Sequence, residues 1–367
     1  MEPVLKILFL EPFFGGSHKD FALGFKESSV HEVDLLTLPP RFWKWRMRGA
    51  ALALLDQIGN PGDYDLIFAT DMLDLADFKA LGGKNLPPVV LYFHENQLSY
   101  PLGPHEKRDF HLGFTNIISA HAADGLLFNS QFHLNDFMKA ARQLVKQMPD
   151  FRPVRVLDKI EQKARILYPG CRFPAHIGGA ASLPSEPPLI VWNHRWEYDK
   201  DPETFFAAIG KLKQAEIPFS LAVLGEQYEI VPKVFEQARQ EFKDEILAWG
   251  YVDSRKEYES WLGKGRVVVS TAIQENFGIS VMEAVRFGCF PLLPKRLSYP
   301  ELIPEKFHGK VFYRSGDDFF KKLKELLLHP EGLAREGREL SDSAGRFSWE
   351  IMGREYDKAL IQYANLT

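Results

Sequence analysis

The sequence predicts an α/β protein built from two doubly wound, Rossmann-like domains. Its 367 residues exceed one ordinary hydrophobic core, so the length favours two domains. Short apolar runs alternate with amphipathic stretches along the chain, which is typical of βα units on a parallel sheet. Residues 169–188 hold five prolines and three glycines without periodicity, and this composition indicates a linker between two halves.

The first half, residues 1–168, contains apolar runs of strand length separated by helical patterns. We expect strands at residues 4–10, 30–36, 66–69, 89–93, 125–129 and 164–168. Helices are expected between them, among others at residues 108–122 and 131–147.

The second half, residues 189–345, has the same pattern without repeating the sequence. Strands are expected at residues 189–193, 219–224, 247–251, 267–270 and 289–293, with helices that include residues 202–216, 231–243 and 279–287. In the final segment, residues 346–367, a helical stretch at 348–364 is expected to pack back on the first domain. Two doubly wound domains facing each other predict a cleft lined by loops at the carboxyl ends of the strands.

The composition excludes several classes of protein. Hydrophobic residues make up 45% and charged residues 26%, which describes a soluble globular chain and excludes disorder, collagen and coiled coil. No run of 18 apolar residues occurs, and the N-terminus with Lys6 lacks the pattern of a signal peptide, so we expect a cytoplasmic protein without stable membrane insertion. The cysteines Cys171 and Cys289 cannot form a disulfide framework or a four-cysteine zinc site. A net charge of −4 argues against broad coating by nucleic acid and leaves room for a local basic patch.

The strongest local signal follows the expected strand at residues 267–270. Glu275 precedes an Asn-Phe-Gly sequence, and Glu283 comes eight residues after it. Eight residues correspond to about 12 Å along a helix and return to nearly the same face. Two such carboxylates could hold hydroxyl groups at opposite ends of a nucleotide-sugar, while the helix N-terminus, closely approached at Gly278, binds its pyrophosphate. Two glutamates at this spacing also occur by chance, and the strand–loop–helix context is what favours a site.

A second signal follows the expected strand at residues 189–193. Arg195 and Lys200 lie where this strand ends, and the Asp201-Pro202 pair marks a helix start. A guanidinium and an ammonium group at this position can neutralise the charge on a departing diphosphate. The alternative is an ordinary solvent-exposed loop, which the density of aromatic and basic residues disfavours.

Two polar segments of the first half also follow expected strands. A pair of glycines after the first strand lets a phosphate or sugar approach the backbone, and a histidine opens a polar loop after the fourth strand. A lone histidine is usually structural, but one at a strand end is a candidate to contact substrate. The candidates are Gly15, Gly16, His18, His94, Asn96 and Gln97.

Residues 41–48 combine four cations with three aromatic residues and no acid. Cations contact phosphates and flat rings stack on unpaired bases, which is the combination used on single-stranded RNA. The alternative is an amphipathic helix start whose tryptophans are buried. The candidate RNA-binding residues are Lys44, Trp45, Arg46 and Arg48.

No metal site is assigned. Asp63 and Asp65 have the spacing with which some sugar transferases hold a metal, but they precede a strand and lie at the wrong edge for a cleft, so a turn is the favoured interpretation. Asp199 and Asp201 have the same spacing with a cation between them.

Taken together, these motifs resemble those of the retaining glycosyltransferases of family 4, which have the GT-B fold. The resemblance is strongest to the tRNA-queuosine α-mannosyltransferases and covers nearly the whole chain. The two glutamates of the EX7E pair are shared by many family-4 enzymes, whereas three blocks are more particular to the queuosine subgroup: GGSHK at residues 15–19, HENQL at 94–98 and HRWE at 194–197.

The resemblance implies a donor, an acceptor and a role for each site residue. The donor would be GDP-mannose and the acceptor queuosine in the anticodon loop of tRNA-Asp, with no cofactor and no metal. The first domain would lie on the acceptor side, with His94 near the hexose, and the second would bind the nucleotide-sugar. The donor-binding residues would be Glu275, Asn276, Phe277, Gly278 and Glu283, with Arg195 and Lys200 on the diphosphate and Tyr251 and Val252 near the base. Asn276 departs from the family, which often has an aromatic residue there, and this change could alter the choice of hexose.

Retention without an evident nucleophile fits a front-face displacement, in which Glu275 orients the sugar and the departing phosphate takes the acceptor proton. Two other functions stay open at this point. One is a family-4 transferase with a lipid-linked or small-molecule acceptor, and the other is a non-catalytic RNA-binding protein with a relic sugar site. The donor base and the oligomeric state are also open.

Overall fold

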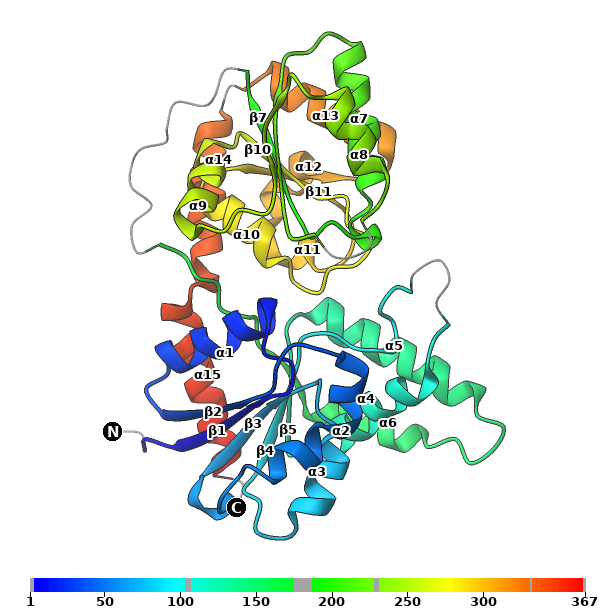
Figure 1. Ribbon diagram of the computed structural model, residues 1–367, viewed down its shortest axis with the longest axis vertical. Helices are drawn as coiled ribbons and strands as arrows, with labels where there is room; N and C mark the ends of the chain where they lie inside the picture. The colour runs from blue at the N-terminus through cyan, green and yellow to red at the C-terminus, as the bar shows by residue number, and fades with distance from the viewer. Residues whose placement is uncertain (1–2, 103–106, 175–186, 228–230, 331, 366–367) are drawn as a thin grey trace. The chain divides into compact units, whose positions relative to one another are not determined.

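The computed structural model describes residues 3–102, 107–174, 187–227, 231–330 and 332–365. The chain divides into two compact units. Unit 1 comprises Met1–Cys171 together with Phe347–Thr367, and unit 2 comprises Arg172–Arg346 (Figure 1). Most of the segment expected to be a linker, residues 175–186, lies outside the described residues. Each unit holds one six-stranded parallel sheet, which confirms the predicted α/β class with two doubly wound domains.

The sheet of unit 1 has the strand order β2-β1-β3-β4-β5-β6. The chain passes from β2 back to β3 on the other side of β1, so consecutive loops diverge at the carboxyl ends of β1 and β3, as in other doubly wound sheets. The strands are β1 Lys6–Glu11, β2 Glu32–Thr37, β3 Leu66–Thr70, β4 Val89–Phe93, β5 Gly125–Phe128 and β6 Ala164–Ile166. The helices are α1 Gly16–Ser28, α2 Trp43–Leu55, α3 Leu75–Gly82, α4 Phe110–Ala122, α5 Gln131–Gln147, α6 Val154–Lys163 and α15 Trp349–Ala364, with a 3-10 turn at Pro61–Asp63.

Alternate residues of each central strand face opposite sides of this sheet, so helices cover both sides. Leu8 and Leu10 of β1 pack with α2 to α6, whereas Ile7 and Phe9 pack with α1 and α15. The contact between α1 and α15 is close because Gly24 has no side chain: a Cβ there would lie 2.0 Å from Nε1 of Trp349. Figure 1 shows these two helices on the same side of the sheet.

The sheet of unit 2 has the strand order β12-β11-β10-β7-β8-β9. Its strands are β7 Leu189–Asn193, β8 Ser220–Leu224, β9 Ile246–Gly250, β10 Val267–Val269, β11 Phe290–Pro294 and β12 Phe312–Tyr313. Its helices are α7 Pro202–Gln214, α8 Val234–Glu241, α9 Arg255–Lys264, α10 Ile279–Arg286, α11 Tyr299–Leu302, α12 His308–Val311, α13 Gly316–Leu328 and α14 Leu333–Ala344, with 3-10 turns at Tyr198–Lys200 and Glu305–Phe307. A further 3-10 turn, Gly345–Phe347, spans the boundary at which the chain returns to unit 1.

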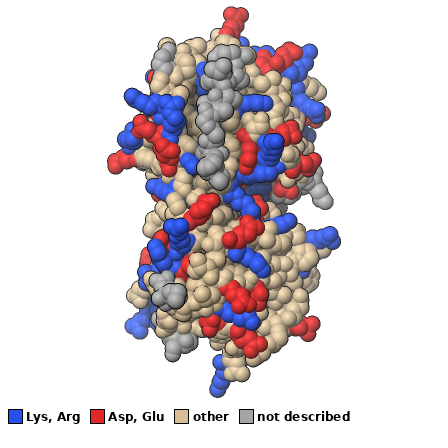
Figure 2. Space-filling model, turned by 90° about the vertical axis from the view of Figure 1, so that its left-hand side faces the viewer, with Lys and Arg blue, Asp and Glu red and all other residues tan. Residues whose placement is uncertain are grey.

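Surface charge is mixed on the side of each unit that Figure 2 displays. Basic and acidic side chains alternate there among uncharged residues, and no extended basic patch is visible among the described residues of that side. No helix in the described part of the chain is long and apolar enough to cross a membrane.

Candidate active site

In unit 2, Lys200 is the centre of a buried charged cluster at the carboxyl edge of the sheet. The chain leaves β7, forms the 3-10 turn Tyr198–Lys200 and enters α7, where Asp201 caps the helix by accepting a hydrogen bond from the Thr204 amide at 3.2 Å. The Lys200 side chain is 8% exposed, and its Nζ lies 3.1 Å from Oδ2 of Asp199 and 3.4 Å from Oε2 of Glu275. Burial alone would lower the pKa of Lys200, but the Glu275 and Asp199 carboxylates outweigh it and raise that pKa, so the ammonium stays charged.

The loop that carries Glu275 is held in place by hydrogen bonds from three directions. Thr271 Oγ1 donates to the Lys200 carbonyl at 2.7 Å, and the Ile273 amide donates to the Asp199 carbonyl at 2.7 Å. The Arg296 guanidinium donates to the carbonyls of Ala272 and Thr271, and Ser298 Oγ donates to that of Phe277. Glu275 is therefore fixed beside Lys200 before any ligand binds.

Glu275 lies in the loop before the helix that carries Glu283, so the helical spacing applied to this pair is wrong, while the expected helix start at residue 279 is confirmed. The helix α10 begins at Ile279, four positions after Glu275, because Gly278 turns the chain with a φ of 95°. Few residues other than glycine adopt this conformation, and a Cβ at this position would lie 3.0 Å from Cε1 of Tyr299. The eight-residue spacing thus joins a loop residue to a helix residue.

Glu283, on α10, is bound by two side chains that sequence analysis missed. Arg255 Nη1 donates to Glu283 Oε1 at 2.7 Å, and the Tyr258 hydroxyl donates to Oε2 at 3.2 Å. Asn193, the last residue of β7, donates to the Tyr258 hydroxyl at 3.0 Å. Burial alone would lower the pKa of Arg255, but the Glu283 carboxylate raises it, so this pair is an ion pair.

The other predicted residues of unit 2 take no part in the contacts of Lys200 and Glu283 described above. The Arg195 side chain is 43% exposed and its guanidinium lies 3.0 Å from the Glu197 carboxylate. Asn276 and Phe277 are both buried, and Asn276 Oδ1 accepts a hydrogen bond from the Gln274 amide group at 3.0 Å. Tyr251 is 63% exposed and Val252 is half-buried in the loop after β9.

In unit 1, three neighbouring strands bring a second set of titratable groups to one edge of the sheet. Glu11 ends β1, Asp71 follows β3 and His94 follows β4. Glu11 Oε2 lies 3.1 Å from Nδ1 of His18, and the His18 and His94 rings lie 4.2 Å apart between centroids. Asp71 Oδ1 accepts a hydrogen bond from the His94 amide at 2.8 Å.

The titratable groups of this cluster have pKa values that are shifted in different directions. Burial alone would lower the pKa of His18, but Glu11 raises it to about 9, so His18 is an imidazolium at neutral pH. Burial and the His18 charge hold the pKa of His94 well below its ordinary value, so His94 is neutral. Burial raises the pKa of Asp71 to about 8. Ligand atoms of Glu11, His18 and His94 lie within 4.8 Å of one another, so these three residues also form a group that could hold a cation.

Several residues of unit 1 that were predicted to bind substrate form hydrogen bonds or close packing contacts within the unit. Asn96 is buried, and its Oδ1 accepts hydrogen bonds from the amides of Leu98 and Ser99, which makes it a turn former. Gly15 lies so close to Pro40 that a Cβ would be 2.5 Å from the proline Cβ, whereas Gly16 has a φ of 49° with open space around it. Gln97 is half-buried, and its side-chain amide donates to Glu95 at 3.0 Å.

The basic and aromatic segment at residues 41–48 begins α2. Trp45 is 76% exposed, and Phe42, with a φ of 54°, is 73% exposed. The alternative of buried tryptophans therefore applies only to Trp43, which is partly buried against Met47, Met72 and Leu112. Arg48 contacts the Thr115 hydroxyl and the Asp74 carboxylate. Of the other three cations, Arg41 and Lys44 are exposed, whereas Arg46 is half-buried and donates to the Pro39 carbonyl.

Comparisons with known proteins show the fold and the class of protein. A family model for glycosyl transferases group 1 matches residues 179–340. Sucrose-phosphate synthase of Thermosynechococcus elongatus is similar over 99% of this chain and 100% of its own, with a TM-score of 0.74 and 14% identity. HepE of Anabaena, in complex with UDP, is similar over 97% of this chain and 100% of its own, with a TM-score of 0.69 and 14% identity. This protein is a glycosyltransferase with the GT-B fold, as predicted.

The N-terminal half narrows this class to one family. A family model described as tRNA-queuosine alpha-mannosyltransferase N-terminal matches residues 6–171. A Drosophila melanogaster protein described as tRNA-queuosine alpha-mannosyltransferase is 34% identical over 335 residues, which are 88% of this chain and 87% of that protein. The chain belongs to the tRNA-queuosine alpha-mannosyltransferase family, and the predicted resemblance is confirmed.

Proposed function

We propose that this protein transfers mannose from GDP-mannose to queuosine in the anticodon loop of tRNA-Asp, with retention of configuration. Membership of the family supports the acceptor and the reaction. The observation that carries the chemistry is the buried Lys200 ammonium, 3.4 Å from Glu275 at the carboxyl edge of the unit 2 sheet. A fixed cation beside a fixed carboxylate suits a sugar whose diphosphate becomes more negative as it leaves.

The donor is held by residues of unit 2 in this proposal. Glu275 and the backbone of residues 276–278 hold the mannose, while Lys200 and the exposed Arg195 contact the diphosphate. Glu283 binds the ribose hydroxyls, and its ion pair with Arg255 keeps the carboxylate charged and oriented. The base lies at the loop with Tyr251 and Val252, where the exposed tyrosine ring offers a stacking surface.

The reaction is a front-face displacement. An acceptor hydroxyl oxygen bonds to the anomeric carbon on the face from which GDP leaves, and the bond between that carbon and the phosphate oxygen breaks with its electron pair on the phosphate. The same phosphate oxygen takes the proton of the acceptor hydroxyl, so the products are mannosyl-queuosine and GDP. Lys200 and Arg195 offset the charge on the leaving diphosphate, and Glu275 orients the sugar without attacking it.

The acceptor lies against unit 1 in this proposal. His94 is neutral because burial and the charge of His18 lower its pKa. A neutral imidazole can accept a hydrogen bond from the transferred hexose or donate one to it. The exposed Trp45 ring offers a face for stacking an unpaired base of the loop, with Lys44 and Arg46 beside it for phosphates.

The test is transfer of labelled mannose from GDP-mannose to tRNA that carries queuosine and to the same tRNA without it, read out by mass spectrometry of the digested nucleosides. A gain of one hexose on queuosine alone supports the proposal. Labelling of a lipid extract or a small-molecule acceptor in place of tRNA, or labelling that is the same with and without queuosine, would contradict it. UDP-sugars and ADP-sugars serve as donor controls.

The role of Lys200 is tested by Lys200→Met. We expect turnover to fall roughly 100-fold, because a lost charge contact at a leaving group costs about 3 kcal/mol. Lys243→Met is the matched control, since Lys243 is an exposed lysine of the same unit outside the site. Thermal unfolding of both variants separates loss of turnover from loss of fold, and unchanged turnover in a folded Lys200→Met protein would remove Lys200 from the mechanism.

A further inference from the structure

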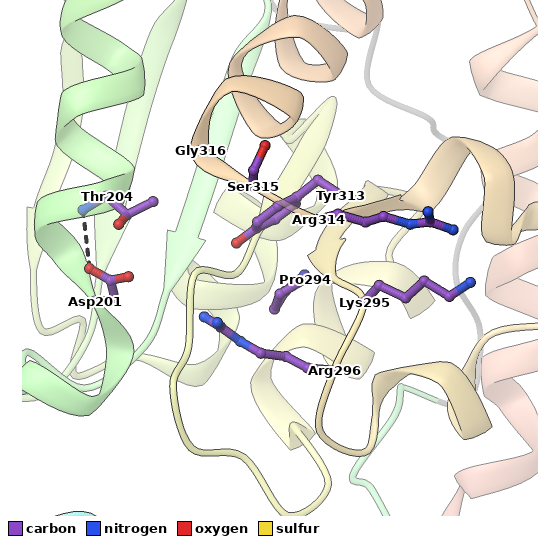
Figure 3. Close-up of a pocket in the computed structure, with 9 residues that line it drawn as sticks. All are labelled: Asp201, Thr204, Pro294, Lys295, Arg296, Tyr313, Arg314, Ser315 and Gly316. Atoms are coloured by element: carbon purple, nitrogen blue, oxygen red, sulfur yellow. Dashed lines mark hydrogen bonds between the residues drawn. The ribbon is translucent and has the colours of Figure 1, made fainter.

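A basic cavity lies beside the candidate donor site of unit 2, at the carboxyl ends of β11 and β12. Its volume is about 440 Å³, which is within the range of ligand-binding pockets. Figure 3 shows its lining, which is formed by Asp201, Thr204, Pro294, Lys295, Arg296, Tyr313, Arg314, Ser315 and Gly316. The function proposed above uses none of these side chains.

Three of the lining residues are cations. In Figure 3, Lys295 and Arg314 extend in the same direction, and Arg296 extends the other way, toward the side of Asp201. All three are exposed, and within the described part of the chain none of the three side chains forms an ion pair. Lys295 and Arg314, two exposed cations at the rim of one cavity that form no ion pair with a described carboxylate, favour an anion as its ligand.

The acid that lines the cavity, Asp201, and the two in the first turn of α13 all have other contacts. Asp201 accepts the Thr204 amide, Asp318 accepts the Arg314 amide at 2.9 Å, and Asp317 forms an ion pair with Lys211. The cavity also contains the start of α13, a helix of 13 residues that begins at Gly316, where Asp317 and Asp318 in the first turn offset the positive end of the helix dipole.

We infer that this cavity binds a backbone phosphate of the tRNA substrate. The inference rests on the proposed function and adds a contact from unit 2. A site for a small free phosphate would enclose its cations, whereas exposed Lys295 and Arg314 reach outward, as contacts to the phosphate chain of a large ligand do. A protein of net charge −4 needs such a local basic site to hold a polyanion.

The location of the cavity also fits an acceptor that is being glycosylated next to it. The strand order places β11 beside β10, so the cavity and the Glu275 loop share one edge of the same parallel sheet. Arg296 connects them directly, because its guanidinium donates to the carbonyls of Thr271 at 3.2 Å and Ala272 at 3.1 Å. A phosphate bound here would hold the tRNA at the edge where the sugar is transferred.

The test uses the full chain with the double substitution Lys295→Ala and Arg314→Ala, leaving Arg296 in place because it also supports the Glu275 loop. We expect tRNA binding to weaken roughly tenfold. In a plot of the logarithm of the binding constant against the logarithm of the salt concentration, the steepness of the slope should decrease by about 1 to 2. Binding of GDP-mannose, measured by calorimetry, should be unchanged, and KM for tRNA should rise with little change in kcat.

The matched control is Lys321→Ala with Lys324→Ala, which removes the same charge from exposed positions of α13 outside the cavity. Wild-type tRNA affinity and salt dependence in the cavity variant, or an equal loss in the control variant, would overturn the inference. Stabilisation of the wild type by inorganic phosphate together with unaltered tRNA affinity in the cavity variant would also overturn it, and would assign the cavity to a small anion. Failure of the proposed function itself is distinguishable, because the wild-type protein would then transfer no mannose to queuosine.

Discussion

Lys200 illustrates how single residues of this protein are fixed by their neighbours. An isolated buried ammonium would lose its proton, but two carboxylates and the Gln274 carbonyl, 2.8 Å away, keep Lys200 charged. The same ammonium group compensates the charge of the buried Asp199 carboxylate and of the half-buried Glu275 carboxylate. Removing the lysine therefore leaves a buried carboxylate, Asp199, and a half-buried one, Glu275, without their cation, which lowers stability as well as turnover, so both have to be measured.

His18 gives a prediction of pH dependence. Its pKa rises from 6.5 to about 9 on folding, so the stability it contributes is fully present below pH 6.5 and is lost as the pH rises through 9. This pKa shift sets an upper limit of about 3 kcal/mol on the contribution of His18 to the free energy of unfolding. Chemical denaturation at pH 6.5 and pH 9.5 should show a loss of stability in the wild type that is clearly smaller in His18→Gln. Equal losses in the two proteins would show that the Glu11 pair does not hold this proton.

Individual residues also show where sequence reasoning stops. Lys200 and Glu275 were predicted because each follows an apolar strand, and parallel strands end at one edge. Glu11 and Asp71 have the same signal, a carboxylate directly after an apolar run, and could have been found by it. Arg255 carries no such signal, because its partner Glu283 lies 28 residues away on a different helix and only the packing of α9 against α10 joins them.

At the scale of elements, periodicity predicted the strands well, and it also predicted the start of α10 at residue 279. Every strand expected from an apolar run is present, with ends that move by a few residues, because buried parallel strands need continuous apolar sequence. β12, only two residues long at Phe312–Tyr313, is too short to leave a pattern. The position of Glu275 outside α10 follows from the positive φ of Gly278, a local backbone choice that an eight-residue spacing does not reveal.

Gly278 supplies the prediction for this element. Gly278→Ala would place a methyl group in a left-handed conformation and 3.0 Å from Tyr299, so we expect a loss of unfolding free energy of at least 1–2 kcal/mol and reduced turnover as the Glu275 loop shifts. Gly288→Ala is the matched control, because Gly288 has a similar φ of 98° with nothing within 4 Å. The control should lose similar backbone energy but keep its turnover. Loss of turnover in both variants would mean that the backbone strain, and not the Tyr299 contact, displaces the loop.

At the scale of the whole molecule, unit 1 is assembled from both ends of the chain. Residues from α15 complete the hydrophobic cluster that covers one face of the unit 1 sheet, with Tyr356 fully buried among Phe21, Phe25 and Phe68. Polar contacts fix the helix as well, since the Tyr356 hydroxyl donates to the Tyr168 carbonyl and Ser29 donates to the Asp357 carboxylate at 2.6 Å. Unit 2 lies between these two parts of unit 1 in the sequence.

This arrangement predicts that a chain ending at residue 346 keeps unit 2 and loses unit 1. Without α15 the aromatic face of the unit 1 sheet is open to water, and each large buried side chain left uncovered costs about 2 kcal/mol. Hydrogen exchange followed by mass spectrometry should show that peptides from β1, β3 and β4 lose protection while those from β7, β8 and β10 keep it. A chain ending at residue 365 is the control and should match the full-length protein. Retained protection of β1 and β3 in the shorter chain would contradict this prediction, because it would show that the N-terminal segment of unit 1 folds without α15.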